Sequence, residues 1–413
     1  MKQKPDYNAQ ARANPVFLTA KTAVCLMADA GISDADKIVD KLGLHGGDFG
    51  MADPEMMLGN ELVVEAKYRT MCRLIENTGI QTNVDLPCGY TPKAVHMSEK
   101  GLRFVGLDLP IVAQEVEPVL LSLAAHPELI RIQGADATNL ESLRNALNGI
   151  VGPLCISTEG MMMYFTESEA SSVISNIRSL LEEYGGCWIT PDSEFMVQFF
   201  LTFQSVLGQH ALQKLEASRD KATEQSDVVT LTNSFIVNPA DIHGTSDAAI
   251  ALLQRYGLKA ERINLAANMP ELKAYHKLTQ AQITAFKEAM TKCHYWKITL
   301  DADWKRQNKE QETQPFEMKY VVMDDQFKVS LRGRMDTITA PEMLTAWEAE
   351  KAGNKICGIE IDCSDLQYVS SAGLRVLLMM YKSLEDKSRF RMIHVNNEVK
   401  EILDVTGFDQ FLL

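Results

Sequence analysis

Apolar and polar residues alternate in two ways along the chain. Residues 1–75 carry apolar side chains at helical spacing, as in NPVFLTAKTAVCLMADAGI, and predict a mainly helical segment. From about residue 80 to 200, short apolar runs alternate with longer amphipathic stretches. The short runs predict β-strands at 82–86, 103–109, 129–136, 153–160 and 186–192, and HYWKITL predicts a later strand at 294–300. Strands that alternate with helices predict a parallel sheet covered on both faces.

One helix of this region is marked at both ends. Thr166 and Glu169 have the spacing of a capping box, in which each side chain bonds the backbone N–H of the other residue. Gly185 and Gly186 follow the last apolar residues, and glycine commonly ends a helix. We therefore predict a helix between these positions, with a buried face formed by Ala170, Val173, Ile174, Ile177 and Leu181.

A polar stretch, DADWKRQNKEQETQPFE at 301–317, interrupts the pattern and predicts a linker. After it, residues 326–336 alternate as a strand, and helices and strands then follow in the order βαβαβα. Thr339 and Glu342 have capping-box spacing at the start of the first of these helices. About ninety-five residues in this order can form an independent small α/β domain. The expected organisation is a helical cover at 1–75, an α/β domain at 76–302, a linker at 303–317 and a second domain at 318–413.

The bulk composition narrows the classes of function. A chain of 413 residues with 46% hydrophobic and 23% charged residues is typical of a globular protein with two or three domains. The net charge of −14 argues against general affinity for nucleic acid or an anionic membrane. No apolar run approaches the ~20 residues of a membrane span. The eight cysteines are scattered singly without zinc-site spacing, and they predict reduced, mostly buried thiols and a cytoplasmic location.

Chemically informative residues stand at the ends of the predicted strands. In an open parallel sheet, ligands bind outside the carboxyl ends of the strands. The residues at those ends include Asp85, Gly89, Asp108, Asp136, Glu159 and Gly160. The Asp108 carboxylate can accept two hydrogen bonds from vicinal ribose hydroxyls, Asp136 is placed to bond an adenine amino group, and Gly89 allows close approach of the backbone to a ligand. The pattern favours a nucleoside-like ligand, although each of these residues is also an ordinary turn former.

The turn VDLPCGYTPK at 84–93 contains a single glycine. A dinucleotide-binding turn needs three, and Pro87 lacks an N–H that a phosphate would use. The turn therefore disfavours a pyrophosphate, whereas a nucleoside ligand without phosphate is compatible with it.

The series VDLPCGYTPK, FVGLDLP, GADATN and STEGMMMYFTESEA resembles the leucine carboxyl methyltransferase-like family of S-adenosylmethionine enzymes, which includes small-molecule O-methyltransferases. The resemblance covers about residues 15–300 and is strongest from 80 to 195. Its most distinctive matches are Asp108-Leu109-Pro110 and Glu159-Gly160 with Tyr164-Phe165. It implies a Rossmann-like class I methyltransferase fold with S-adenosylmethionine as cofactor.

The resemblance also implies a set of cofactor-binding residues. By position these are Arg69, Asp85, Gly89, Lys93, Asp108, Leu109, Asp136, Ala137, Glu159 and Gly160. Asp85, Gly89 and Glu159 would lie near the methionine part of the cofactor, and Lys93 or Arg69 would pair with its carboxylate. Two positions depart from the family pattern: Pro87 replaces the first glycine, and Thr91-Pro92-Lys93 replaces Asp-Thr-Arg.

Catalytic residues are not assigned by the sequence. Transfer of a methyl group to a carboxylate needs mainly alignment, because the sulfonium is already activated. A hydroxyl acceptor would need a base, and none of the eight histidines falls in a recognisable motif. We therefore name no general base.

The stretches LRGRMDTITAPEML and IDCSDLQYVSSAGLRVLL resemble STAS domains, the fold of bacterial anti-sigma factor antagonists, over about residues 318–413. In that family a serine that opens a helix is phosphorylated by a partner kinase that also acts as an anti-sigma factor. The resemblance implies Ser371 as phosphoacceptor, with Ser370 where many members carry Asp and Asp336 as the nearby acid. A helix N-terminus can hold a phosphate, and the added charge beside Asp336 would repel an acidic partner. The alternative is that Ser371 is only an N-cap.

Two functional interpretations remain open. In the first, the protein is an S-adenosylmethionine-dependent O-methyltransferase that acts on a carboxylate or hydroxyl of a small molecule or protein. Its STAS domain would then bind an anti-sigma factor or a serine kinase. In the second, the amino-terminal domain is a non-catalytic sensor of S-adenosylmethionine, or a scaffold, and the STAS domain acts as a partner switch. Neither interpretation includes a metal, nucleic acid or a membrane.

Overall fold

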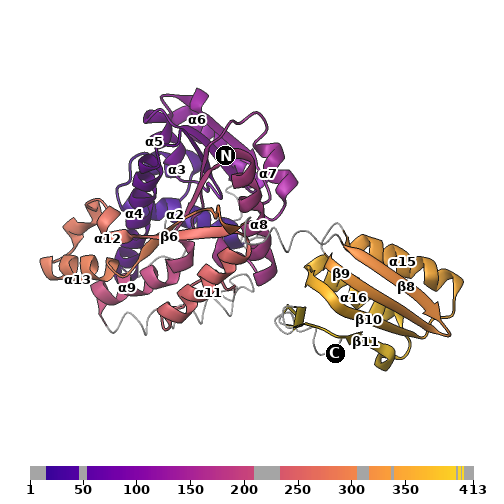
Figure 1. Cartoon of the computed structure of the whole chain (residues 1–413). Coiled ribbons are helices and arrows are strands. Elements are labelled where there is room, and N and C mark those ends of the chain that lie inside the picture. The colour runs from indigo at the N-terminus through magenta and orange to yellow at the C-terminus, as the bar shows by residue number, and fades with distance from the viewer. Residues whose placement is uncertain are drawn as a thin grey trace. The chain divides into compact units, whose positions relative to one another are not determined.

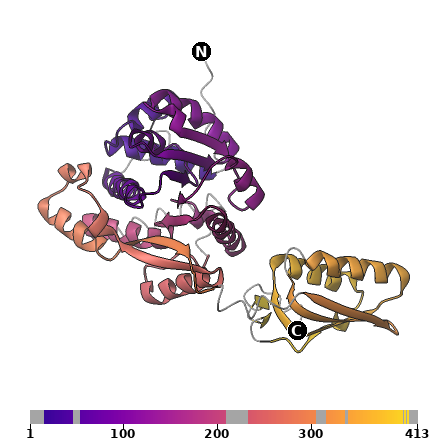
Figure 2. The same ribbon diagram turned by 45° about the horizontal axis from the view of Figure 1, so that its top comes forward.

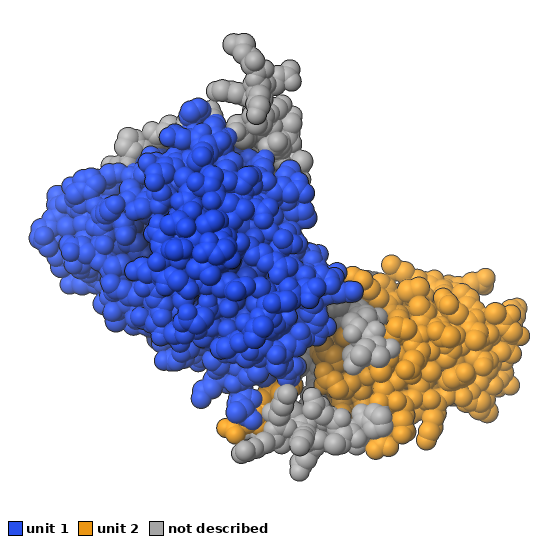
Figure 3. Space-filling model, turned by 90° about the horizontal axis from the view of Figure 1, so that it is seen from above, with its two compact units in different colours: residues 1–302 blue, residues 303–413 orange. Residues whose placement is uncertain are grey.

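The computed structural model describes residues 15–45, 54–208, 233–304, 316–335, 339–396, 399–400 and 402–403. The chain forms two compact units, residues 1–302 and 303–413 (Figure 3). Most of the expected linker, residues 305–315, lies outside the described residues, as does Asp336. The expected last helix, residues 398–408, is described only at 399–400 and 402–403.

Unit 1 begins with helices, as the sequence predicts. They are α2 (Pro15–Asp29), α3 (Ala35–Leu42) and α4 (Pro54–Asn77). The central element that follows is a seven-stranded sheet in the order β3-β2-β1-β4-β5-β7-β6. Its strands are β1 (Thr82–Asp85), β2 (Arg103–Asp108), β3 (Ile130–Gly134), β4 (Leu154–Ser157), β5 (Gly186–Thr190), β6 (Leu258–Asn264) and β7 (His294–Leu300).

The first five strands are parallel, and β7 runs antiparallel to both β5 and β6. All residues of β1 and β4 are buried, as expected for central strands covered on both faces. The six strands predicted from the sequence are confirmed. The edge strand β6 was missed, because its sequence LKAERIN places charged residues between the apolar ones and lacks a continuous apolar run.

The direction of each connection between parallel strands determines on which face of the sheet its helix lies. The helices of this unit after α4 are α5 (Lys93–Glu99), α6 (Pro110–Leu123), α7 (Leu140–Ala146), α8 (Glu167–Tyr184), α9 (Phe195–Leu207), α11 (Ile242–Arg255), α12 (Leu265–Asn268) and α13 (Gln280–Met290). The path β1-β2-β3 moves toward one edge of the sheet and β4-β5 toward the other. The helices of these connections, α5, α6, α7 and α8, are labelled in Figure 1. Right-handed crossovers therefore place α5 and α6 on one face and α7 and α8 on the other. The direction reverses between β1 and β4, which makes this the switch point of the sheet.

The capping box of α8 is confirmed. The Thr166 hydroxyl accepts from the Glu169 N–H at 3.3 Å, and Glu169 Oε2 accepts from the Thr166 N–H at 2.9 Å. The predicted apolar face of the helix is buried, and Gly185 follows its last residue with φ of +73°. Local sequence signals therefore fix both ends of this helix.

Unit 2 contains a four-stranded sheet in the order β11-β10-β9-β8. Its elements are β8 (Glu317–Met323), β9 (Gln326–Met335), α15 (Ala340–Gly353), β10 (Gly358–Val369), α16 (Ser371–Ser383) and β11 (Phe390–Ile393). Both crossovers run in one direction, so α15 and α16 lie on the same face (Figure 2). Buried and exposed residues accordingly alternate along most of β9.

Two details of unit 2 differ from expectation. Strand β8, which pairs antiparallel with β9, precedes the first strand that the sequence predicts. The capping box at Thr339 and Glu342 is wrong: the Thr339 hydroxyl donates to the Arg334 carbonyl at 2.8 Å and makes no cap hydrogen bond. The backbone carbonyl of Arg334, five residues earlier in the chain, has replaced the expected cap partner.

The predicted fold class is confirmed. Unit 1 has the Rossmann-like fold of class I methyltransferases with a helical amino-terminal cover, and unit 2 is a small α/β domain. Six of the eight cysteines are buried and all eight are free thiols. Within the described ranges, every helix is too short or too polar to span a lipid bilayer.

Candidate functional site

The carboxyl ends of β1 and β4 meet at the switch point through side chains. Asp85, the last residue of β1, is fully buried. Ser157, the last residue of β4, donates its hydroxyl to Asp85 Oδ1 at 2.6 Å. Asn83 Nδ2 in turn donates to the Ser157 hydroxyl oxygen at 3.0 Å. These bonds fix the Asp85 carboxylate at the position where the fold binds ligands.

Lys93, the first residue of α5, forms a buried ion pair with Asp85. Its Nζ lies 2.9 and 3.0 Å from the two carboxylate oxygens of Asp85 and 3.6 Å from Glu159 Oε2. Burial lowers the pKa of Lys93, but the carboxylates of Asp85 and Glu159 raise that pKa more, so it lies above its ordinary value. The ammonium is therefore charged, and most of its hydrogen-bonding capacity is taken by Asp85.

Lys67 on α4 completes what we call the charged cluster, namely Lys67, Asp85, Lys93 and Glu159. Its Nζ lies 3.6 Å from Glu159 Oε1 and 4.6 Å from the centre of the Phe195 ring. The two ammonium groups balance the two carboxylates. Glu159 has the most exposed side chain of the four, at 15%. A ligand group that reaches this cluster therefore meets Glu159 and Lys67 before the buried pair, and a group with charges of both signs could pair with both of them.

Asp108 and Gly89 are also brought together, at the end of β2. The Gly89 N–H donates to Asp108 Oδ2 and the Leu109 N–H donates to Asp108 Oδ1, both at 2.7 Å. Each oxygen keeps one lone pair, because a carboxylate has about four acceptor positions. Burial raises the pKa of Asp108 to about 6, despite the two backbone N–H donors. Gly89 has φ of +54° and only Thr91 Cγ2, at 4.0 Å, near the place of a Cβ, so a ligand could approach its backbone.

The end of β3 lies beside Asp108, because the Ala135 N–H donates to the Asp108 carbonyl at 2.7 Å. Asp136 is exposed, and its Oδ1 accepts from the N–H and the hydroxyl of Thr138 at 2.9 and 2.7 Å. Ala137 is buried, with its carbonyl bonded to Asn176 Nδ2. Asp136 thus lies one residue after the contact with Asp108. One of its carboxylate oxygens is used in hydrogen bonds within its own turn.

Two exposed apolar residues closely follow Asp108 in the chain. Leu109 is 36% exposed and Ile111 is 50% exposed, although both are large aliphatic residues. Exposed side chains of this kind are suited to contact with a flat base. Ile111 was not among the residues expected from the sequence.

Asp192 holds the turn after β4. Its Oδ1 accepts from the Gly160 N–H at 2.6 Å, and its Oδ2 accepts from the N–H groups of Met161 and Met162 at 2.9 and 3.1 Å. Asp192 is 2% exposed. Because Glu159 directly precedes this turn, Asp192 positions the most accessible carboxylate of the charged cluster.

Replacing Asp192 with alanine should loosen this turn. Three backbone N–H groups would lose a charged acceptor, and each such hydrogen bond contributes about 1.5–3 kcal/mol. We expect a loss of about 2–4 kcal/mol of stability after relaxation, and faster amide hydrogen exchange at residues 160–165. Asp192→Asn keeps one acceptor oxygen and should show a smaller effect. Equal exchange rates in the wild type and Asp192→Ala would contradict this role.

Arg69, which the sequence suggests as a partner for the cofactor carboxylate, pairs with a residue of its own helix. Its Nε donates to Glu65 Oε1 at 2.6 Å, and the buried Glu65 carboxylate also accepts from the N–H groups of Lys273 and Ala274. Among the described contacts, Arg69 therefore engages Glu65 and not the charged cluster.

The expected switch residues of unit 2 lie at the start of α16. Ser370 is the N-cap, and its hydroxyl accepts from the Gly373 N–H at 3.2 Å. Ser371 is the first residue of the helix. The Ser370 N–H donates to the carbonyl of Met335, which precedes Asp336 in the sequence. A Cβ at Gly373 would lie 2.9 Å from the same carbonyl, so the helix start approaches the end of β9 closely.

Sequence reasoning missed Lys67, Ser157 and Asp192 as members of the site. Asp192 directly follows Pro191 at the end of β5. The rule that ligands bind outside the carboxyl ends of parallel strands would therefore have identified it. Ser157 is the last residue of β4 and could have been found by the same rule. Lys67 lies inside a long helix, where no local pattern distinguishes it from a solvated lysine.

Two parts of the chain are similar to different groups of known proteins. Residues 319–413 match the family model described as "Mlab, STAS domain", and this part of the chain is a STAS domain. The same part is similar to an anti-sigma factor antagonist from Mycobacterium paratuberculosis, with 23% identity, coverage of 24% of this chain and 83% of that chain, and a TM-score of 0.22.

The remainder of the chain is similar in structure to S-adenosylmethionine-dependent methyltransferases. One is magnesium protoporphyrin IX methyltransferase from Synechocystis with bound SAH, with 11% identity, coverage of 66% of this chain and 97% of that chain, and a TM-score of 0.37. Another is geranyl diphosphate C-methyltransferase from Streptomyces coelicolor, with 12% identity, coverage of 60% and 85%, and a TM-score of 0.30. A search of the curated proteins finds no match to the chain.

Proposed function

We propose that residues 1–302 bind S-adenosylmethionine and transfer its methyl group to a carboxylate or hydroxyl oxygen of a small molecule or protein. The observation that carries the proposal is the buried Asp108 carboxylate, bonded to the Gly89 N–H at the end of β2 and next to the switch point of the sheet. Vicinal hydroxyls of a ribose are suited to the lone pairs that this carboxylate keeps.

Each part of the cofactor has residues of matching chemistry. Asp108 would accept from the ribose hydroxyls, and the exposed Leu109 and Ile111 would pack against the adenine. The methionine part carries an ammonium and a carboxylate, and the charged cluster presents Glu159 and Lys67 to such a zwitterion. S-adenosylmethionine, when bound, supplies an electrophilic methyl group. The protein supplies orientation of the acceptor and exclusion of water.

A sensor without catalysis is the second candidate, and the Lys93–Asp85 pair favours it. Lys93 occupies the position at which the resembling family has an arginine for the cofactor carboxylate. Here the Lys93 side chain is 2% exposed, and its ammonium is bonded to both oxygens of Asp85. A weakly held methionine end would permit adenosine-directed binding without well-aligned methyl transfer.

Calorimetry of the full chain with S-adenosylmethionine and S-adenosylhomocysteine tests the proposal. We expect saturable binding of both ligands. Release of S-adenosylhomocysteine in the presence of a carboxylate-bearing or hydroxyl-bearing acceptor would support the enzyme. Binding that Asp108→Asn weakens, without turnover on any acceptor of a broad panel, would support the sensor. Failure of both ligands to bind at millimolar concentration would refute both candidates.

We further propose that the STAS domain regulates unit 1 or a partner through phosphorylation of Ser371. Ser370 already supplies the N-cap of α16, so the capping requirement does not account for Ser371. A phosphate at the first helical position is stabilised by the free N–H groups and the helix dipole. The partner would be an anti-sigma factor or a serine kinase, and the added charge would alter its docking.

Phosphate mapping after incubation with a serine kinase tests the assignment. We expect modification of Ser371 in the wild type and its loss in Ser371→Ala. Ser370→Ala should still be phosphorylated, although loss of the cap costs about 1 kcal/mol. A phosphate found at neither serine would remove the assignment.

A further inference from the structure

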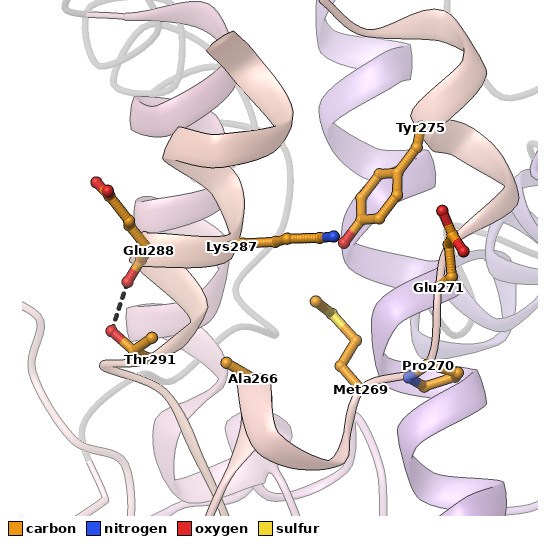
Figure 4. Close-up of a pocket in the computed structure, with 8 residues that line it drawn as sticks. All are labelled: Ala266, Met269, Pro270, Glu271, Tyr275, Lys287, Glu288 and Thr291. Atoms are coloured by element: carbon orange, nitrogen blue, oxygen red, sulfur yellow. Dashed lines mark hydrogen bonds between the residues drawn. The ribbon is translucent and has the colours of Figure 1, made fainter. Parts of the chain in front are cut away.

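A cavity of about 470 Å³ lies in the helical connection between β6 and β7, at the carboxyl end of β6 (Figure 4). Ala266, Met269 and Pro270 form an apolar part of its lining, and Glu271, Tyr275 and Lys287 a polar part. None of these residues belongs to the charged cluster or surrounds Asp108. The volume lies in the range of small-molecule sites, about 300–1,000 Å³.

Tyr275 brings an unused hydrogen-bond donor to this cavity. Its side chain is buried, with 7% exposure, and its hydroxyl has no hydrogen-bond partner within the described part of the chain. Burial raises the pKa of Tyr275 to about 12, and the negative charge of Glu271 adds to this effect. The phenol therefore keeps its proton at neutral pH. A buried donor without a partner destabilises the folded protein, and a bound acceptor oxygen would offset this cost.

Charged groups of both signs flank the phenol. Lys287 Nζ lies 5.2 Å from the centre of the Tyr275 ring, and its ammonium extends across the cavity toward the hydroxyl (Figure 4). Glu271 lies on the other side of the same ring (Figure 4). Two donors and one carboxylate thus converge on one end of the cavity, and the apolar lining lies next to them.

The wall that carries Tyr275 is held in place from α4. The short helix η5 (Lys273–Lys277) begins where the buried Glu65 carboxylate accepts from the N–H groups of Lys273 and Ala274, both at 2.8 Å. At its other end, Lys277 pairs with Glu61. Because charged hydrogen bonds fix both ends of η5, the orientation of the phenol is set before any ligand binds.

We propose that this cavity is a second binding site, for a small zwitterionic amino acid with an aliphatic side chain. The ligand carboxylate accepts from the Tyr275 hydroxyl and the Lys287 ammonium, and the ligand ammonium donates to Glu271. The aliphatic side chain packs on Ala266, Met269 and Pro270. This site does not depend on methyl transfer in the rest of unit 1.

Methyl NMR of the full chain, labelled at the methionine methyl groups, tests the proposal with L-leucine as probe. We expect a saturable shift of the Met269 resonance, assigned by Met269→Leu, with a dissociation constant on the order of 1 mM. The analogues 4-methylpentanoate and 3-methylbutylamine each lack one charged group and should bind about tenfold more weakly. Absence of a saturable shift, or equal binding of either analogue, would overturn the proposal.

Two variants separate a binding role from a structural one. Tyr275→Phe and Lys287→Met should each weaken L-leucine binding about tenfold, the loss of one hydrogen bond to a charged group. Tyr275→Phe should leave the unfolding temperature unchanged or higher, because the hydroxyl has no hydrogen-bond partner among the residues that the structure describes. Lys292→Met removes an exposed lysine outside the cavity lining and should have no effect. Unchanged affinity in Tyr275→Phe would refute the assigned contact.

Discussion

Replacing Asp108 with asparagine should lower the affinity for S-adenosylmethionine about 100-fold or more. The carboxylate would lose charged hydrogen bonds from two ribose hydroxyls, each contributing about 1.5–3 kcal/mol. The amide also has only one acceptor oxygen, whereas Asp108 accepts from the Gly89 and Leu109 N–H groups through different oxygens. One of these N–H groups would then face an NH₂ group. Isothermal titration calorimetry of wild type and variant measures the change.

The ionisation of Asp108 should also make the affinity for S-adenosylmethionine depend on pH. Only the ionised carboxylate can accept from both ribose hydroxyls, and burial raises the pKa of Asp108 to about 6 in the free protein. Affinity should therefore be highest above pH 7 and fall as the pH decreases through about 6, where proton uptake competes with the ligand. Asp108→Asn should show a flatter profile.

Asp136→Asn serves as the matched control for Asp108. It is also a strand-end carboxylate, but it is exposed and bonded within its own turn. We expect less than a tenfold loss of affinity for S-adenosylmethionine, because a single hydrogen bond to the ligand would change from a charged to a neutral acceptor. If Asp108→Asn retains its affinity within threefold, or Asp136→Asn has the larger effect, the ribose assignment to Asp108 is wrong.

Replacing Lys93 with methionine should destabilise unit 1 by about 3–5 kcal/mol, because the buried Asp85 would lose its counterion. Ser157 would still donate a hydrogen bond to the Asp85 carboxylate. One hydroxyl group cannot compensate the negative charge of that carboxylate. Urea unfolding of the full chain measures the loss. Hydrogen exchange of peptides from β1 and β2 assigns the transition to unit 1.

A double variant and a surface control sharpen this test. Asp85→Asn combined with Lys93→Met removes both charges and should recover most of the lost stability, because the cost arises from an unpaired buried charge. Lys100→Met removes a lysine at 60% exposure that lies 3.9 Å from Glu76. It should change stability by no more than about 0.5 kcal/mol. Equal effects of Lys93→Met and Lys100→Met would show that the buried pair has no special role.

The sequence predicts the strand ends because they depend on local patterns. Asp85, Asp108 and Gly160 each follow a short apolar run, and the structure places each at the carboxyl edge of the sheet. The helix from Thr166 is equally local, since its capping box involves residues three apart. Such features need no knowledge of distant partners.

Residues whose roles depend on distant contacts could not be predicted. Lys67 meets Glu159 only because α4 packs beside the switch point, whereas Arg69, two residues further along the same helix, bonds Glu65. The Thr339 hydroxyl bonds the backbone carbonyl of Arg334 and not its expected cap partner. Residue spacing alone cannot choose between such partners, because the choice depends on the folded geometry.

The hydrogen bond between Ser157 and Asp85 joins residues 72 positions apart in the chain. The proposed nucleoside site would consequently require both halves of the open sheet to be assembled, and a fragment ending before β4 would lack the Ser157 contact to Asp85. The ligand would then bind only the folded protein. At a free ligand concentration one hundred times the dissociation constant, this binding would raise the free energy of unfolding of unit 1 by about 2.7 kcal/mol. A cell rich in the ligand would thereby also extend the lifetime of the protein.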